Sequence, residues 1–424
     1  MPITLSHLRR YAIARSLFKP TTLWRAISKL GFVQADPIRA PARAQDLTLR
    51  HRVAGYCAGD LERRYPRLPL EEDFFVNYGF LPRALHQLMH PRVPWSAWSP
   101  ARERKARALL EFVGECGTAH PRAVDAHFAH GKVTNWFGGS SNATTHLLDE
   151  MHYRGLLRVA RRDGGIRVYA LRDSDAPPPD DSAVAARVDA LVDVIVRIYA
   201  PLPASSLVRL LSRLRGGAPQ WAKHRAAALE RAQLRLAHAR VGGIEWYWPA
   251  AETPASARWR PDEAVRLLTP FDPVVWDRRR FEVFWDWRYR FEAYTPSAKR
   301  KLGYYALPLL RHERMIGWGN LTIAGGCSKP ARWWPARPLS QSGRPGLGRR
   351  SPRPSSALHC AICILRSRSS WSSFETMPTS PAPWRPRKYF CAIIAMASST
   401  PSTRRCSITC TTSRGASAST RYLA

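Results

Sequence analysis

A repeated unit of helices closed by a glycine-containing hairpin is the feature that most restricts the fold of this chain. Residues 157–166 and 234–244 match each other with one inserted residue, and each carries a Gly-Gly pair between strand-like runs. Three segments with helical periodicity precede each hairpin. This is the order of a winged helix, whose third helix ordinarily enters the major groove of DNA. The repeat therefore predicts a tandem array of such units.

The helices are predicted from apolar spacing and from residues that favour helix ends. In the first repeat the predicted helices are residues 101–116, a segment that begins at Pro121, and residues 143–154. In the second repeat they are apolar stripes within residues 191–198 and 207–214 and a third segment at 222–233. We expect these repeats to form separate units over residues 101–172 and 184–250.

The N-terminal segment, residues 1–95, is predicted to form a first unit of the same kind. Helices are expected at residues 5–18 and 21–30, followed by a short strand. Because side chains alternate along a strand, Gln34 and Asp36 project on the same side. An amide and a carboxylate side by side can hold one water between them. The alternative is that both residues lie on a solvated strand face, which shows the same alternation.

Residues 262–326 are predicted to form a small antiparallel β unit, because strand-forming residues dominate its second half. Tyrosine beside lysine and arginine suits a surface that stacks on bases and holds phosphates, although a solvated basic face has the same composition. From this block and from the basic segment after the first strand, the candidate DNA-binding residues are Arg43, Arg50, Arg52, Arg278, Arg279, Arg280, Lys299, Arg300, Lys301 and Tyr304.

The C-terminal segment, residues 327–424, differs from the rest of the chain. It holds sixteen Lys or Arg and one acidic residue, Glu375, so it carries +15 of the formal net charge of +34. No periodicity persists there, which predicts an irregular basic tail, either a disordered arm that binds nucleic acid or an out-of-frame translation that truncates the β unit. Two cysteine pairs, Cys360 with Cys363 and Cys406 with Cys410, have spacing that zinc sites use, but no ordered pattern surrounds them.

The charge of the whole chain indicates a polyanionic partner. An excess of this size favours nucleic acid, with an anionic membrane surface as the alternative. The apolar run at residues 191–202 is too short and too charged to span a bilayer, and the charged N-terminus does not resemble a secretory signal. We expect a cytoplasmic, nucleoid-associated monomer that binds double-stranded DNA and makes no membrane contact. The predicted class is α+β, mainly α: tandem winged helices, then the β unit, then the irregular tail.

Two segments resemble the AlkZ-like (YcaQ-type) winged-helix DNA glycosylase family. They are residues 31–36, Gly-Phe-Val-Gln-Ala-Asp, and residues 270–279, Pro-Phe-Asp-Pro-Val-Val-Trp-Asp-Arg-Arg, and residues 294–305 support them. The resemblance covers roughly residues 5–326. It implies base excision repair of alkylated DNA, no metal and no other cofactor. The catalytic Gln-x-Asp pair of the family falls on Gln34 and Asp36.

The chemistry of alkylated purines agrees with this resemblance. Alkylation at N7 makes the base a good leaving group, so the enzyme has to stabilise a cationic sugar and supply water. A carboxylate does both, and an amide can orient the water, which gives Asp36 the role of base or electrostatic stabiliser and Gln34 that of the water-positioning partner. The resemblance thus implies a monofunctional DNA glycosylase acting on N7-modified purines.

Gln45-Asp46 stands where relatives that unhook crosslinks often carry a His pair, so this sequence does not predict crosslink unhooking. Two alternatives to the glycosylase stay open at this point. One is a winged-helix DNA-binding protein without catalysis, which has no need of the Gln-x-Asp pair. The other is an inactive, frame-shifted homologue of a glycosylase.

Overall fold

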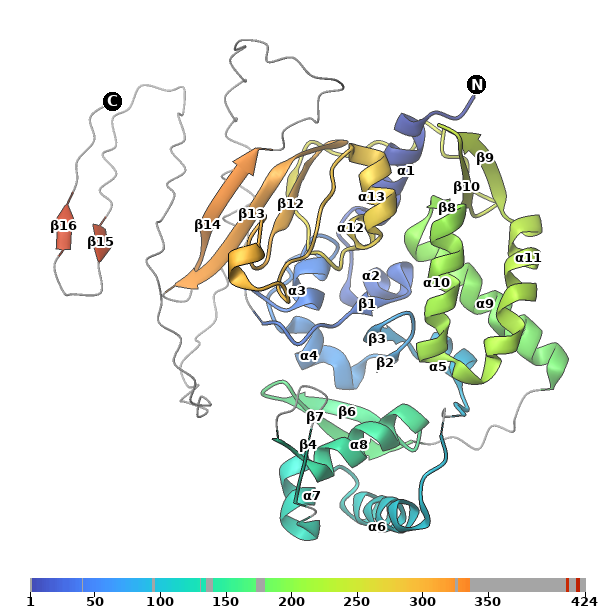
Figure 1. Ribbon diagram of the computed structural model, residues 1–424, viewed down its shortest axis with the longest axis vertical. Coiled ribbons are helices and arrows are strands. Elements are labelled where there is room, and N and C mark those ends of the chain that lie inside the picture. The colour runs from blue at the N-terminus through green and yellow to red at the C-terminus, as the bar shows by residue number, and fades with distance from the viewer. Residues whose placement is uncertain are drawn as a thin grey trace.

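The computed structural model describes residues 2–39, 41–93, 96–129, 131–134, 140–172, 180–324, 327–335, 409–411 and 417–419. The N-terminal unit lies at the centre of the molecule (Figure 1). The second unit lies below it in this view, the third to its right, and the β unit to its upper left.

The N-terminal unit combines short helices with a three-stranded sheet. Its elements are α1 (Leu5–Ser16), α2 (Leu23–Leu30), β1 (Val33–Gln34), α3 (Ala44–Leu49), α4 (Asp60–Arg64), η1 (Tyr65–Arg67), β2 (Leu70–Phe74), β3 (Tyr78–Pro82) and α5 (Arg83–Met89). Thr4 and Thr22 cap α1 and α2 through their side-chain oxygens. The strand order is β1-β3-β2, all antiparallel. The two predicted helices and the strand that follows them are confirmed.

The second unit contains the predicted helices and hairpin. Its elements are α6 (Pro100–Cys116), α7 (Pro121–Phe128), β4 (Lys132–Thr134), β5 (Ser140–Asn142), α8 (Ala143–Arg154), β6 (Leu157–Asp163) and β7 (Ile166–Leu171). Asn142 caps α8, and Gly155 ends it in the left-handed conformation. These helix bounds agree with the predictions from the sequence to within a residue.

The third unit repeats this order of three helices and a hairpin, and its first two helices are longer than those of the second unit. Its elements are α9 (Asp181–Tyr199), β8 (Leu202–Pro203), α10 (Ala204–Gly217), η2 (Pro219–His224), α11 (Arg225–Arg235), β9 (Ala237–Val241) and β10 (Ile244–Trp248). Gly242 and Gly243 both have positive φ and form the turn between β9 and β10. Two glycines are favoured there because both turn positions require φ above zero.

The three units share one strand connection. In each, a segment near the start of the unit pairs with the second strand of the hairpin: β1 with β3, β8 with β10, and Ala119 with Tyr169 of β7 in an isolated bridge. The internal repeat seen in the sequence is therefore also a repeat of strand pairing.

The β unit is a four-stranded antiparallel sheet with two helices between its first and second strands. Its elements are β11 (Val265–Leu267), α12 (Pro273–Trp276), α13 (Arg278–Trp285), η3 (Ser297–Lys299), β12 (Leu307–Arg311), β13 (Arg314–Ala324) and β14 (Cys327–Pro335), with strand order β11-β12-β13-β14. Strands β12 and β13 confirm the prediction of an antiparallel unit. The predicted end at residue 326 is too early, because β14 pairs with β13 beyond it.

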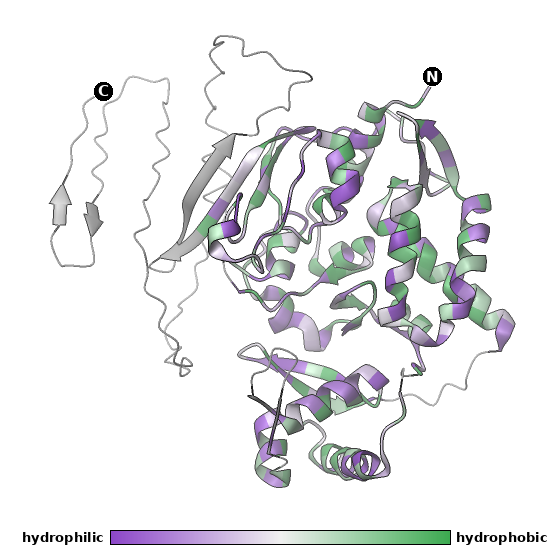
Figure 2. Cartoon of the chain, viewed as in Figure 1, coloured by the Kyte–Doolittle hydropathy of each residue, from purple (hydrophilic) through white to green (hydrophobic). Residues whose placement is uncertain are grey.

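Buried apolar clusters cross the unit boundaries. One of them combines α2 and β1 with residues of α6, α8 and β6 of the second unit. Another joins Ile13 and Leu17 of α1 to Val275 and Phe281 of the β unit. The helices carry mixed hydrophobic and hydrophilic faces rather than wholly apolar surfaces (Figure 2). Within the described residues, no helix is long and apolar enough to cross a membrane.

Most of the predicted tail lies outside the described residues, including Cys360, Cys363 and Cys406 of the candidate zinc pairs. The described part of this segment consists of β14 and a two-stranded pairing of β15 (Thr409–Thr411) with β16 (Ser417–Ser419).

Candidate active site

The backbone around β1 is held in a narrow space. Gly31 ends α2 with φ +77°, and a Cβ there would lie 3.3 Å from Cγ1 of Val194 in α9. Gln34 pairs with Gly79 of β3, where an added Cβ would come within 2.3 Å of the Val33 carbonyl oxygen. Glycine is required opposite Gln34 because any side chain would push the two strands apart. Two glycines thus fix β1, which carries Gln34, whereas Asp36 lies two residues beyond the end of this strand.

The side chain of Gln34 is buried, with 6% of its surface exposed. Its Oε1 accepts a hydrogen bond of 2.9 Å from the indole Nε1–H of Trp276, which is the last residue of α12. Gln34 therefore contacts a residue 242 positions away in the chain. The two segments that carry the family resemblance, residues 31–36 and 270–279, are therefore joined by a hydrogen bond.

Asp36 is half-buried, and its Oδ1 accepts a hydrogen bond of 2.9 Å from the Ile38 N–H. Burial raises the pKa of the Asp36 carboxyl above its ordinary value, and the Ile38 hydrogen bond opposes part of this rise. Asp36 has no ion-pair partner among the described residues. Its carboxylate is thus neither in open solvent nor neutralised by a neighbouring cation, which is the state a general base or a stabiliser of positive charge requires.

A cavity of about 520 Å³ opens beside this pair. It lies between the N-terminal unit and the hairpin of the second unit. Its lining residues are Gln34, Ala35, Asp36, Pro37, Arg39, Arg43, Gln45, Asn77, Tyr78, Pro121, Thr145, Arg162, Gly165, Ile166, Arg167 and Tyr169. Asp36 is the sole acidic residue of this lining and faces four arginines, a charge balance that suits a polyanion such as a phosphodiester backbone.

Three of the four arginines are also held by acidic residues. Arg43 forms an ion pair with Glu62, Arg162 with Glu72, and Arg167 with Asp149. Arg39 has no such partner among the described residues and is exposed. The acidic partners hold these three guanidinium groups in place and balance their charges, while Arg39 is free to contact a ligand.

An acidic strand binds the second unit to the first. Glu71, Glu72 and Asp73 of β2 are each no more than 5% exposed. Glu71 accepts from Arg158 of β6, and Glu72 from Arg162 of the same strand. Buried carboxylates require such partners. These contacts hold the hairpin that forms one wall of the cavity.

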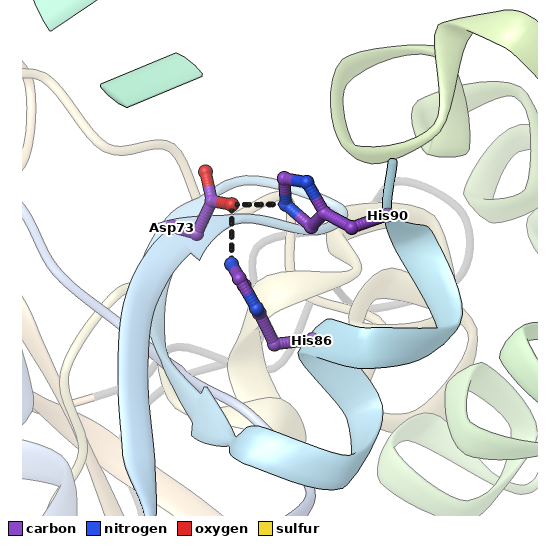
Figure 3. A group of neighbouring side chains, drawn as sticks. All are labelled: Asp73, His86 and His90. Carbon is purple, nitrogen blue, oxygen red and sulfur yellow. Dashed lines mark hydrogen bonds and ion pairs between the residues drawn. The ribbon is translucent and has the colours of Figure 1, made fainter. Parts of the chain in front are cut away.

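Within the described residues, one group has the spacing of a metal site: Asp73, His86 and His90. Figure 3 shows both rings pointing toward the same carboxylate oxygen of Asp73, each with Nε2 at 3.0 Å. A carboxylate only accepts hydrogen bonds, so each Nε2 carries a proton and has no lone pair for an ion. Arg92 also donates to both oxygens of Asp73 at 3.1 Å. The Nε2 atoms of both histidines and both oxygens of Asp73 are therefore engaged in hydrogen bonds, and these atoms do not fit a cation.

The pKa values of this cluster follow from burial and from Arg92. Burial opposes ionisation of Asp73, but the neighbouring Arg92 guanidinium and the two histidine hydrogen bonds hold its pKa well below the usual range. Burial lowers the pKa of His90 to about 2, so this ring is neutral at physiological pH.

Two of the residues predicted to bind DNA are buried and hydrogen-bonded to other groups of the protein, so those predictions are wrong. Arg52 is 0% exposed and pairs with Asp272, and Arg280 is 1% exposed and donates to the carbonyl oxygens of Tyr199 and Pro273. Neither guanidinium group is accessible to a phosphate. Both side chains instead join units of the fold to one another.

The remaining predicted DNA contacts divide into two groups. Arg50 and Arg278 are half-buried and donate to backbone carbonyls, of Leu267 for Arg50 and of Pro270 and Val275 for Arg278, while Arg43 lines the cavity. The residues at the surface of the β unit are Arg279, Lys299, Arg300, Lys301 and Tyr304, with the Arg300 guanidinium 5.0 Å from the centre of the Tyr304 ring. They stay predicted DNA contacts.

Reasoning from the sequence did not identify the contribution of the second unit to the cavity. Arg162, Gly165, Arg167 and Tyr169 belong to the β6–β7 hairpin, which the repeat analysis treated only as architecture. Basic residues on both sides of the Gly-Gly turn were the available signal. Trp276 lies within residues 270–279, but the sequence-based predictions assigned roles only to the arginines of this segment and none to Trp276.

The acid–amide pair thus lies in an arginine-lined cavity between the first two units. The sequence model of the family described as DNA glycosylase AlkZ-like matches residues 27–338. The chain therefore belongs to the AlkZ-like DNA glycosylase family, which is a family of DNA repair hydrolases.

Among solved structures, the fold is similar to that of the DNA glycosylase AlkZ of Streptomyces sahachiroi, with a TM-score of 0.53 and 15% sequence identity. The likeness covers 86% of this chain and 96% of that one. At this identity it shows a shared fold over almost the full length of both chains.

Proposed function

We propose that this protein is a monofunctional DNA glycosylase that hydrolyses the N-glycosidic bond of N7-alkylated purines in double-stranded DNA. The observation that carries the proposal is the Asp36 carboxylate, half-buried and without an ion-pair partner among the described residues, beside Gln34 in an arginine-lined cavity. A carboxylate in this setting stabilises a cationic sugar and accepts a proton from water.

The lining of the cavity supports a reaction with water rather than with an amine of the protein. Glycosylases that cleave the strand use an amine such as a lysine, which forms a Schiff base with the sugar. No lysine occurs among the described residues that line this cavity. Water, activated by Asp36 and oriented by Gln34, is the nucleophile we propose.

We also propose that the three helical units are winged helices. The common strand pairing of β1-β3, Ala119-Tyr169 and β8-β10 supports this assignment. The four arginines of the cavity would hold the DNA backbone next to the lesion, with the nucleotide sugar beside Asp36.

Release of N7-methylguanine from methylated duplex DNA tests the proposal. Purified protein should release the base, and Asp36→Asn should lose release while duplex affinity persists, because asparagine keeps the shape and removes the charge. Arg104→Ala, an exposed change in α6 outside the cavity, serves as the control and should retain release. If the wild-type protein binds duplex without releasing any alkylated base, the non-catalytic alternative holds. If Asp36→Asn loses binding and release together, the role given to Asp36 is wrong.

A further inference from the structure

We infer that Trp276 is a positioning residue that fixes the orientation of the Gln34 amide, an inference that rests on the proposed function. The Trp276 indole donates to Oε1 of Gln34 at 2.9 Å. An indole N–H can only donate, so the oxygen end of the amide has to face Trp276. The NH₂ group is thereby directed to the other side of the amide. Gln34 lines the cavity, and among the described residues its Nε2 has no acceptor.

The orientation of this amide decides how a water molecule can sit beside Asp36. With the NH₂ group toward the cavity, Gln34 donates to the water oxygen, and Asp36 accepts one of the water protons. A lone pair of the water then remains for the anomeric carbon of the sugar. If the amide were reversed, its oxygen would compete with Asp36 for the water protons and leave the water oxygen without a donor.

The reaction that this arrangement favours balances without a further reactant. The C1′–O bond forms from the water lone pair, and the C1′–N9 bond breaks. The bonding electrons pass into the purine ring, where they neutralise the charge that N7-alkylation placed there. The water proton goes to Asp36. Trp276 takes no part in these steps, and its effect is transmitted entirely through Gln34.

Trp276 is itself held by two units. Asp272 caps α12 by accepting from the Val274 N–H at 3.0 Å and pairs with the buried Arg52 of the N-terminal unit. On the other side the Trp276 ring lies 5.3 Å, centre to centre, from that of Tyr199 in α9. An indole fixed in this way can hold the amide in one orientation, since its own position does not depend on Gln34.

Single-turnover release of N7-methylguanine provides the test. Trp276→Phe keeps the ring and removes the donor, so we expect release about 3–10-fold slower, the effect of one neutral hydrogen bond, with unchanged duplex affinity. In a Gln34→Ala background the same substitution should have no further effect, because there is no amide left to orient. Trp248→Phe is the matched control, since it removes an indole hydrogen bond to the Glu252 carbonyl oxygen next to the β10 hairpin of the third unit.

The inference is overturned if Trp276→Phe leaves the wild-type rate unchanged, or if it slows release equally with and without Gln34. Exchange of the Trp276 indole proton, followed by NMR, gives a readout that does not depend on activity. It should be slow in the wild-type protein and faster in Gln34→Ala; equal rates would show that the contact does not form. If the indole proton is protected and the wild-type protein releases no base, the proposed function fails while the contact stands.

Discussion

Replacement of Arg52 should strongly destabilise the protein, because this side chain forms a buried ion pair with every donor engaged. Arg52 donates to both oxygens of Asp272 at 2.8 and 3.0 Å, and to Ser16 O, Ser16 Oγ and Thr48 O at 2.7–3.1 Å. Both side chains of the pair are 0% exposed. Arg52→Met therefore leaves a buried carboxylate without its cation.

Breaking a buried pair by removing one partner costs about 3–5 kcal/mol. For a protein of this size such a loss lowers the midpoint of thermal unfolding by about 5 °C. Arg52→Lys should fall between the wild-type protein and Arg52→Met, because lysine keeps the charge but offers three donors in place of five. Thermal melting followed by circular dichroism measures the series.

Arg279→Met is the matched control for this prediction. It removes the same charge and introduces the same side chain at an exposed site of α13, where a change of about 0.5 kcal/mol or less is expected. If Arg52→Met melts within a degree or two of Arg279→Met, the buried pair does not stabilise the fold as described. If Arg52 contacted a phosphate instead, folded Arg52→Met would show a shallower salt dependence of DNA binding, because methionine removes the charge.

Two further predictions concern catalysis and binding. Burial raises the pKa of Asp36, so single-turnover base release should be lost as the pH falls through a value above the ordinary 3.8. The pH profile is measured over the range in which the protein stays folded. If the acidic side of this profile is centred at or below 3.8, the carboxylate is solvated and the reasoning fails. If the exposed Arg279, Lys299 and Lys301 contact phosphates, their joint replacement by alanine should reduce the log–log salt slope of duplex binding by up to about 3. The charge-matched control is the joint replacement by alanine of three exposed basic residues of α6, Arg104, Lys105 and Arg107. This helix lies at the opposite end of the molecule from the β unit (Figure 1).

The helices and hairpins were predictable because their signals are local. Apolar spacing defined α8 and α10, and the glycines that end α2 and α8, Gly31 and Gly155, adopt the left-handed conformation in the structure. The sequence predicted from strand alternation that Gln34 and Asp36 lie together; both line one cavity, although β1 ends at Gln34. Each of these inferences depends on residues a few positions apart, which the sequence supplies directly.

The burial of charged residues was not predictable in the same way. Glu71, Glu72 and Asp73 form an acidic run that resembles a solvated loop, yet the structure buries all three in β2. Their partners, among them Arg158 and Arg162, lie about ninety residues further along the chain. A local pattern gives no information on whether a charge meets an opposite one in the core, so Arg52 and Arg280 were mistaken for surface residues for the same reason.

The resemblance of residues 270–279 to the family has a structural explanation other than DNA contact. Within ten residues, Asp272 binds Arg52 of the N-terminal unit, Trp276 binds Gln34, and Asp277 pairs with Arg209 of the third unit. The segment thus joins three parts of the molecule around one amide.

This connection also makes the geometry of the site depend on the β sheet. The helix that follows Trp276 is tied to the sheet by Trp285, which donates to the Glu313 carbonyl oxygen, and the chain beyond it by Tyr289, which donates to the Ala306 carbonyl oxygen at 2.7 Å. Loosening of the sheet would therefore reach Gln34 through Trp276, whereas Asp36 and the arginines of the cavity are held by the first two units. Damage to the β unit should impair orientation of the water before it impairs the charge of the cavity, so catalysis should be lost before DNA binding.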